Sequence, residues 1–93
     1  MYNDECKEKL FRSEKMRRVI TSLVRVDVHS ENYLSRYKLK TNMKNEELYV
    51  WVNNEDDTIE QAMLISTVTN KSVFFHRIDG IPDWIDNGLR AVR

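Results

Sequence analysis

Apolar and polar side chains alternate along three segments of this sequence, residues 24–29, 33–40 and 48–53. A period of two is the spacing at which successive residues of a strand point to opposite faces of a sheet. β-branched residues at positions 19–21 extend the first segment toward the N-terminus, because branching at Cβ favours extended backbone. The pattern therefore predicts three strands with one apolar face each, the first two joined as a hairpin through a turn at residues 30–32.

An alternative interpretation places the start of the first strand in a helix. The residues that share one helical face are Met16, Ile20, Leu23 and Val24. Such a helix would continue the one predicted over residues 3–15, where Asn3 or Asp4 can cap the first turn. The sequence leaves this boundary open.

Residues 53–78 are harder to assign to strands, turns or helices. The polar stretch at residues 53–58 predicts a turn, because it offers no apolar anchor. Residues 59–68 are compatible with a short helix capped by Thr58 or with a strand. We favour a strand, paired through a turn at residues 69–71 with a last strand at residues 72–78.

A final helix is predicted from Pro82, which suits the first turn of a helix. Gly88 inside this helix either weakens it or marks close packing. The apolar face consists of Ile81, Trp84, Ile85, Leu89 and Val92. The fold class is thus α+β: residues 1–93 are predicted to form a single small domain with an N-terminal helix, an antiparallel meander of about five strands, and a C-terminal helix packed on one sheet face.

Composition narrows the class of protein. Apolar residues make up 41% of the 93 residues, enough to offset chain entropy by burial. Cys6 is the only cysteine, so neither an intramolecular disulfide nor a CxxC metal site can form. No apolar run approaches the roughly 18 residues of a membrane span, and the chain begins with charged residues rather than an apolar signal segment. We expect a cytoplasmic protein without a membrane partner.

Charge is divided between the two halves of the chain. Residues 1–45 hold eleven Lys and Arg against six Asp and Glu, and residues 46–93 hold four against nine, so +5 and −5 cancel. This division predicts a charged partner, or self-association through complementary faces.

The predicted strands would place basic and aromatic side chains together on one face of the sheet. If Val24, Val26 and Val28 point toward the helices, with the apolar residues of the next two strands, the opposite face carries side chains suited to binding a macromolecule or nucleotide. These candidate binding residues are Arg25, His29, Arg36, Lys38, Lys40, Tyr49 and Trp51. Such rings and cations suit a dimer or partner-protein contact and also single-stranded nucleic acid, where rings stack on bases and cations meet phosphates. Burial of the rings under a loop is the third interpretation.

Two further charged clusters have simpler interpretations. The basic cluster of Arg12, Lys15, Arg17 and Arg18 would spread around a helix, which favours solvation or pairing with Glu8 and Glu14 over a phosphate site. The acidic cluster at residues 55–57 lacks the spaced ligands and the glycine of a calcium loop. We interpret it as a solvated turn and predict no metal ligands.

No catalytic residues are predicted. A nucleophile needs a base held against it, and no spacing links Cys6 to His29 or His76. Gly80 and Gly88 are the only glycines, so no glycine-rich phosphate loop can form. We expect no enzymatic activity and no cofactor.

These features favour a non-enzymatic interaction protein, a small homodimeric regulator or inhibitor that binds a partner protein and occludes a surface of another macromolecule. Such a composition is common among compact accessory proteins, including many that viruses encode. The alternative is binding of single-stranded nucleic acid or a nucleotide through the basic, aromatic face.

Overall fold

The computed structural model describes residues 18–28 and 33–93. The predicted N-terminal helix at residues 3–15, its possible continuation before residue 18, and the turn at residues 30–32 lie outside the described residues. So do Cys6 and His29.

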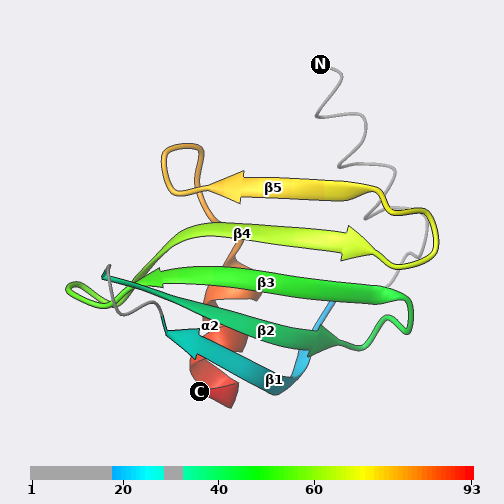
Figure 1. Cartoon of the computed structure of the whole chain (residues 1–93), viewed down its shortest axis with the longest axis horizontal. Helices are drawn as coiled ribbons and strands as arrows, with labels where there is room; N and C mark the ends of the chain where they lie inside the picture. The colour runs from blue at the N-terminus through cyan, green and yellow to red at the C-terminus, as the bar shows by residue number, and fades with distance from the viewer. Residues whose placement is uncertain (1–17, 29–32) are drawn as a thin grey trace.

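The described residues form one five-stranded antiparallel sheet and one helix (Figure 1). The strands pair in chain order, each with the next, which confirms the predicted meander. Their bounds are β1 Ile20–Val28, β2 Leu34–Thr41, β3 Glu46–Asn53, β4 Thr58–Ser66 and β5 Ser72–His76. The helix α2, Asp83–Val92, crosses one face of the sheet, as predicted.

Two ambiguous segments are resolved in favour of strands. Residues 58–66 form β4, so the strand interpretation of the segment after Thr58 holds. Residues 20–28 form β1, so the alternative helix does not continue to Val24. The last strand is shorter than predicted, because β5 ends at His76 and Ile78 lies in the following turn with 96% of its surface exposed.

The connections use residues that tolerate unusual backbone. Asp57 and Asn70 both have φ of 60°, in the hairpin turns after β3 and β4. Asp and Asn adopt this left-handed conformation more readily than most residues because their short side chains bond the local backbone. Their places match the turns predicted at residues 53–58 and 69–71.

The core lies between the sheet and α2. Its buried members from the sheet are Ile20, Leu39, Leu48, Val50, Val52, Ile59, Ala62, Leu64, Val73 and Phe75. Ile85 and Leu89 of α2 are buried against them, and Trp84 packs at the margin. The predicted apolar face of the final helix is therefore confirmed.

The predicted inner face of β1 holds only in part. Val26 lies opposite Tyr37 on the helix side but is 41% exposed at the edge of the sheet. Val24 falls at a register shift and is 48% exposed, whereas Ile20 is buried and Leu23 packs against the core. The pairing of β1 with β2 shifts register twice, between Ile20 and Ser22 and between Leu23 and Arg25. Each shift interrupts the simple period of two, so alternation around Val24 no longer says which side chain points inward.

Candidate functional site

The sheet face opposite α2, called the open face below, gathers most of the candidate binding residues. Leu39 and Val50 are buried on the helix side, so their neighbours in sequence point away from α2. The register places Lys38 opposite Tyr49 and Arg36 opposite Trp51. Six of the seven candidates, namely Arg25, Arg36, Lys38, Lys40, Tyr49 and Trp51, share this face. The seventh, His29, lies outside the described residues.

The open face also holds residues that the sequence interpretation did not assign. Tyr49 lies opposite Met63, and Met63 lies opposite Phe74 of the edge strand. Trp51 is half-buried and Phe74 is 47% exposed, so neither ring belongs to the core. The apolar strip is the name used below for Tyr49, Trp51, Met63 and Phe74. Alternation within residues 61–65 would have predicted Met63 once that segment was taken as a strand.

A second band, the cationic strip, runs along the β1 and β2 side of the same face. It comprises Arg25, Arg36, Lys38 and Lys40. Asp27 lies between the two arginines: its carboxylate accepts hydrogen bonds from Arg25 Nε at 2.8 Å and from Arg36 Nε at 3.2 Å. The hydrogen bonding of Arg36, followed by the charge of Arg25, lowers the pKa of Asp27 even though partial burial acts in the opposite direction.

Tyr49 connects the two strips. The Arg36 guanidinium lies 5.6 Å and the Lys38 ammonium 5.9 Å from the centre of its ring. Its hydroxyl donates a hydrogen bond to Glu47 at 3.1 Å, and Lys38 Nζ lies 3.7 Å from the same carboxylate. Among the described residues, Lys40 is therefore the member of the cationic strip that no carboxylate neutralises.

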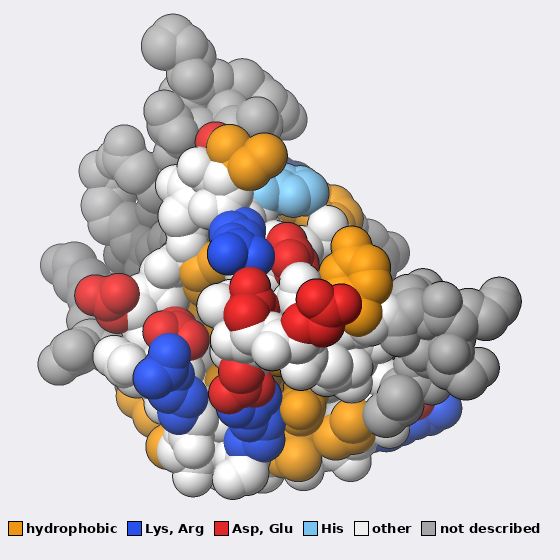
Figure 2. All heavy atoms as spheres, turned by 90° about the vertical axis from the view of Figure 1, so that its left-hand side faces the viewer, with side chains coloured by type: hydrophobic (Ala, Val, Ile, Leu, Met, Phe, Trp, Pro, Cys, Tyr) orange, Lys and Arg blue, Asp and Glu red, His pale blue; other side chains and the backbone are white. Residues whose placement is uncertain are grey.

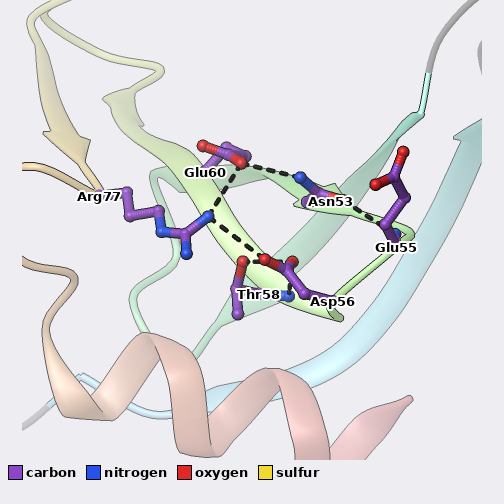
Figure 3. A network of polar contacts seen from close by, with 6 residues as sticks. All are labelled: Asn53, Glu55, Asp56, Thr58, Glu60 and Arg77. Carbon is purple, nitrogen blue, oxygen red and sulfur yellow. Dashed lines mark hydrogen bonds and ion pairs between the residues drawn. The ribbon is translucent and has the colours of Figure 1, made fainter.

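The acidic cluster forms the tip of the β3–β4 hairpin, and two of its three carboxylates, those of Asp56 and Asp57, pair with arginines. Asp56 accepts hydrogen bonds from the Thr58 hydroxyl at 2.7 Å and from Arg77 at 3.5 Å, and Glu60 accepts one from Arg77 at 3.1 Å (Figure 3). Figure 2 shows acidic and basic side chains interleaved over this end of the molecule. The Thr58 hydroxyl bond, more than any other contact, lowers the pKa of Asp56.

Asp57 is tied to the end of the chain. Arg93 donates to its carboxylate at 2.5 Å, and this hydrogen bond is the main cause of the lowered pKa of Asp57. Within residues 18–28 and 33–93, no group of three or more His, Cys, Asp or Glu side chains is placed to hold a metal ion. Asp56, Asp57 and Glu60 are each paired with an arginine.

Arg18 is the one member of the predicted basic cluster that the structure describes. Arg18 is buried and donates to Glu46 through Nε at 2.8 Å and through Nη2 at 2.5 Å. This partner lies 28 positions along the chain. The expected partners Glu8 and Glu14 lie outside the described residues. The other members, Arg12, Lys15 and Arg17, lie outside the described residues.

A small pocket lies between α2 and the start of β4. It has a volume of about 180 Å³ and is lined by Thr58, Ile59, Ile81, Asp86 and Arg90. Sites for drug-sized ligands typically enclose about 300 to 1,000 Å³. This pocket is therefore smaller than a typical site for a drug-sized ligand.

Comparisons with models of protein families, with curated proteins and with solved structures find no match to this chain. Among the helices in the described part of the chain, none is both long and apolar enough to cross a membrane. The open face, with its two strips, is the candidate site on which a function can be argued.

Proposed function

We propose that this protein is a non-enzymatic interaction module that binds a partner protein through the open face and occludes part of that partner's surface. The observation that carries the proposal is the apolar strip, where aromatic and thioether side chains of three neighbouring strands lie in register and partly exposed. Protein interfaces are enriched in Tyr, Trp, Phe, Met and Arg and depleted in charged residues at their centre. The apolar strip would form that centre and the cationic strip its rim.

The charges of the open face favour a protein over a nucleic acid. Four cations share the cationic strip with two carboxylates, Asp27 and Glu47, which leaves a net charge of +2. A phosphate approaching Arg25 or Arg36 would meet the carboxylate that already holds both guanidinium groups. Phosphate binding draws its affinity from cations that are free to replace counterions, and here most are occupied.

The same charges define the partner. A net positive rim steers acidic surfaces toward the open face and repels basic ones. Lys40, which no described carboxylate neutralises, is the point at which a partner's Asp or Glu would add a new ion pair. The expected partner surface is therefore apolar at its centre and carries a carboxylate at one margin.

The test is site-specific photo-crosslinking followed by a binding measurement. A photoreactive phenylalanine analogue at position 51 should capture the partner in the native host, whereas the same group at Asn87, exposed on α2, should not. With the purified partner, Trp51→Ala should weaken binding about tenfold or more, because truncation of a central Trp is among the costliest changes at an interface. Equal capture from both positions, or unchanged affinity of the variant, would contradict the proposal.

Single-stranded nucleic acid or nucleotide binding is the second candidate, and the stacking of cations on Tyr49 is the observation that favours it. Trp84→Phe leaves Trp51 as the only tryptophan, so fluorescence then reports on the open face. Quenching by an oligonucleotide that weakens as salt is raised would support this candidate. Absence of quenching at low salt would remove it.

A further inference from the structure

β5 is an edge strand whose outer backbone groups can be identified from its pairing. Ser66 N–H donates to Lys71 C=O at 2.8 Å, and Arg77 N–H donates to Glu60 C=O at 3.0 Å. In an antiparallel pair, every second residue directs both backbone groups at its partner strand. Residues 71, 73, 75 and 77 therefore face β4, and the backbone groups of Ser72, Phe74 and His76 are directed away from it. No described strand pairs with them.

The two edges of the sheet differ in how well they are protected. β1 carries two register shifts and the charged residues Arg25 and Asp27, features that discourage a second strand from pairing. β5, with the sequence SVFFH, has no charged residue, no Pro and no Gly, and its pairing with β4 has no shift. An uncharged, unbulged edge is a template for strand addition.

We propose that β5 of a second copy of this chain pairs antiparallel with β5 across a two-fold axis at Phe74. The pairing is self-complementary: Phe74 meets its own counterpart, and Ser72 of each copy meets His76 of the other. All three have outward backbone groups, so each supplies a donor and an acceptor. The rings of Phe74 and His76, stacked with centroids 6.4 Å apart, lie on the open face beside the new contact.

The flanking residues agree with this register. The same two-fold axis brings the turn after β5, with Ile78 96% exposed, near the turn before β5, with Val68 69% exposed. It also sets Lys71 of one copy near Arg77 of the other. These like charges are offset because Arg77 already binds the carboxylates of Asp56 and Glu60.

The consequence is one continuous sheet made of two five-stranded halves, with the two apolar strips adjoining at its centre. This proposal concerns the β5 edge and does not depend on what the open face binds. The two proposals can therefore fail separately. A dimer that binds no partner protein would support only the β5 pairing, and a monomer that binds a partner would support only the proposed function.

The test combines molar mass with amide exchange in the full chain. Light scattering after gel filtration, from about 1 µM to about 500 µM to cover weak association, should show the mass rising from 11.2 kDa toward twice that value. Amide exchange at Ser72, Phe74 and His76 should slow with concentration, whereas the amides of Val73 and Phe75, already bonded to β4, should not change.

Two variants locate the interface. Phe74→Pro removes an outward N–H that β4 does not use, and Pro is accepted at such edge positions, so the chain should fold and remain monomeric. Phe74→Lys should also be monomeric, whereas Val24→Lys, equally exposed on β1, should still dimerise. A wild-type monomer at every concentration would overturn the proposal and leave the edge to a strand of another protein. A dimer that persists in both Phe74 variants would overturn it too.

Discussion

Adjacent glutamates at positions 46 and 47 have very different surroundings. Glu46 holds Arg18 through two hydrogen bonds, and the two side chains are only 10% and 3% exposed. Glu47 lies 3.7 Å from Lys38, with both side chains about one-third exposed. Loss of one member of a buried pair removes hydrogen bonds that water does not readily replace, whereas water replaces the contacts of an exposed pair.

We therefore expect Glu46→Ala to lower the free energy of unfolding by about 1.5 to 3 kcal/mol or more, because it removes two charge-assisted hydrogen bonds from a nearly buried guanidinium. Glu47→Ala is the matched control and should cost about 0 to 1 kcal/mol. Urea denaturation followed by Trp fluorescence measures both. Similar losses in the two variants would contradict the assignment of Glu46 as the partner that matters.

Which charged side chains pair with one another was the feature of individual residues that the sequence predicted least well. The sequence interpretation sought partners for Arg18 within one helix and missed Glu46, the partner that the described part of the chain supplies from β3. By contrast, the pairing of Arg25 with Asp27 was accessible, because alternation already placed both on one face two residues apart. Side chains far apart in sequence meet only through the sheet register, which alternation within a single strand does not specify.

At the scale of elements, α2 packs closely against β1 at Gly88. A Cβ atom added at Gly88 would lie 2.7 Å from Ile20 Cδ1 and 3.0 Å from Ile20 Cβ. The first of these atoms could rotate away, but the second is fixed by the β1 backbone. Of the two interpretations of Gly88, close packing is therefore the one that the structure supports.

Gly88→Ala should consequently destabilise the fold although Ala favours helix by about 1 kcal/mol. Overpacking typically costs about 1 to 3 kcal/mol, so we expect a net loss of up to about 2 kcal/mol in thermal or urea unfolding. Asn87→Ala, exposed on the same helix, should be neutral or slightly stabilising. Adding Ile20→Val to Gly88→Ala should recover part of the loss, and a full loss in that double variant would contradict the contact.

The strands show where alternation succeeds and where it fails. β2 and β3 pair without a register shift. Their predicted faces are confirmed, because Lys38 lies opposite Tyr49 and Arg36 lies opposite Trp51 on the open face. β1 shifts twice, so alternation fails at Val24, which is exposed, while Leu23 packs inward. A bulge is favoured by the fit of one strand to its neighbour and to α2, and its cause is not contained in the strand's own sequence.

At the scale of the whole molecule, the basic and acidic halves of the sequence do not form two separate charged surfaces in the described residues. Their side chains form ion pairs at several places on the molecule. Asp27, Asp56 and Asp57 each face an arginine, and each has a lowered pKa. The unfolded chain therefore binds protons more readily at these residues than the folded chain does. Their contribution to stability is complete above the ordinary Asp pKa of 3.8 and is lost as pH falls through the lower folded values.

We expect the melting temperature to change little from pH 7 to pH 5 on account of these groups and to fall as pH drops below about 4. Circular dichroism melts at a series of pH values measure this. Asp27→Asn should have a shallower acid dependence, and high salt should flatten it further because the carboxylates of Asp56 and Asp57 are largely exposed. A melting temperature that rises below pH 4 would contradict the role of these pairs.

Local chemistry in the sequence determined the succession of strands, the turns at Asp57 and Asn70, and the amphipathic final helix, because period, backbone tolerance and helical spacing act within a few residues. It also placed Lys38 and Trp51 on one side of the sheet. Only the tertiary structure decided that Arg25 and Arg36 share Asp27, that Met63 and Phe74 extend the aromatic surface, and that no other described strand pairs with the outer side of β5. These depend on which strands become neighbours and in which register, and that choice is made by packing across the whole sheet.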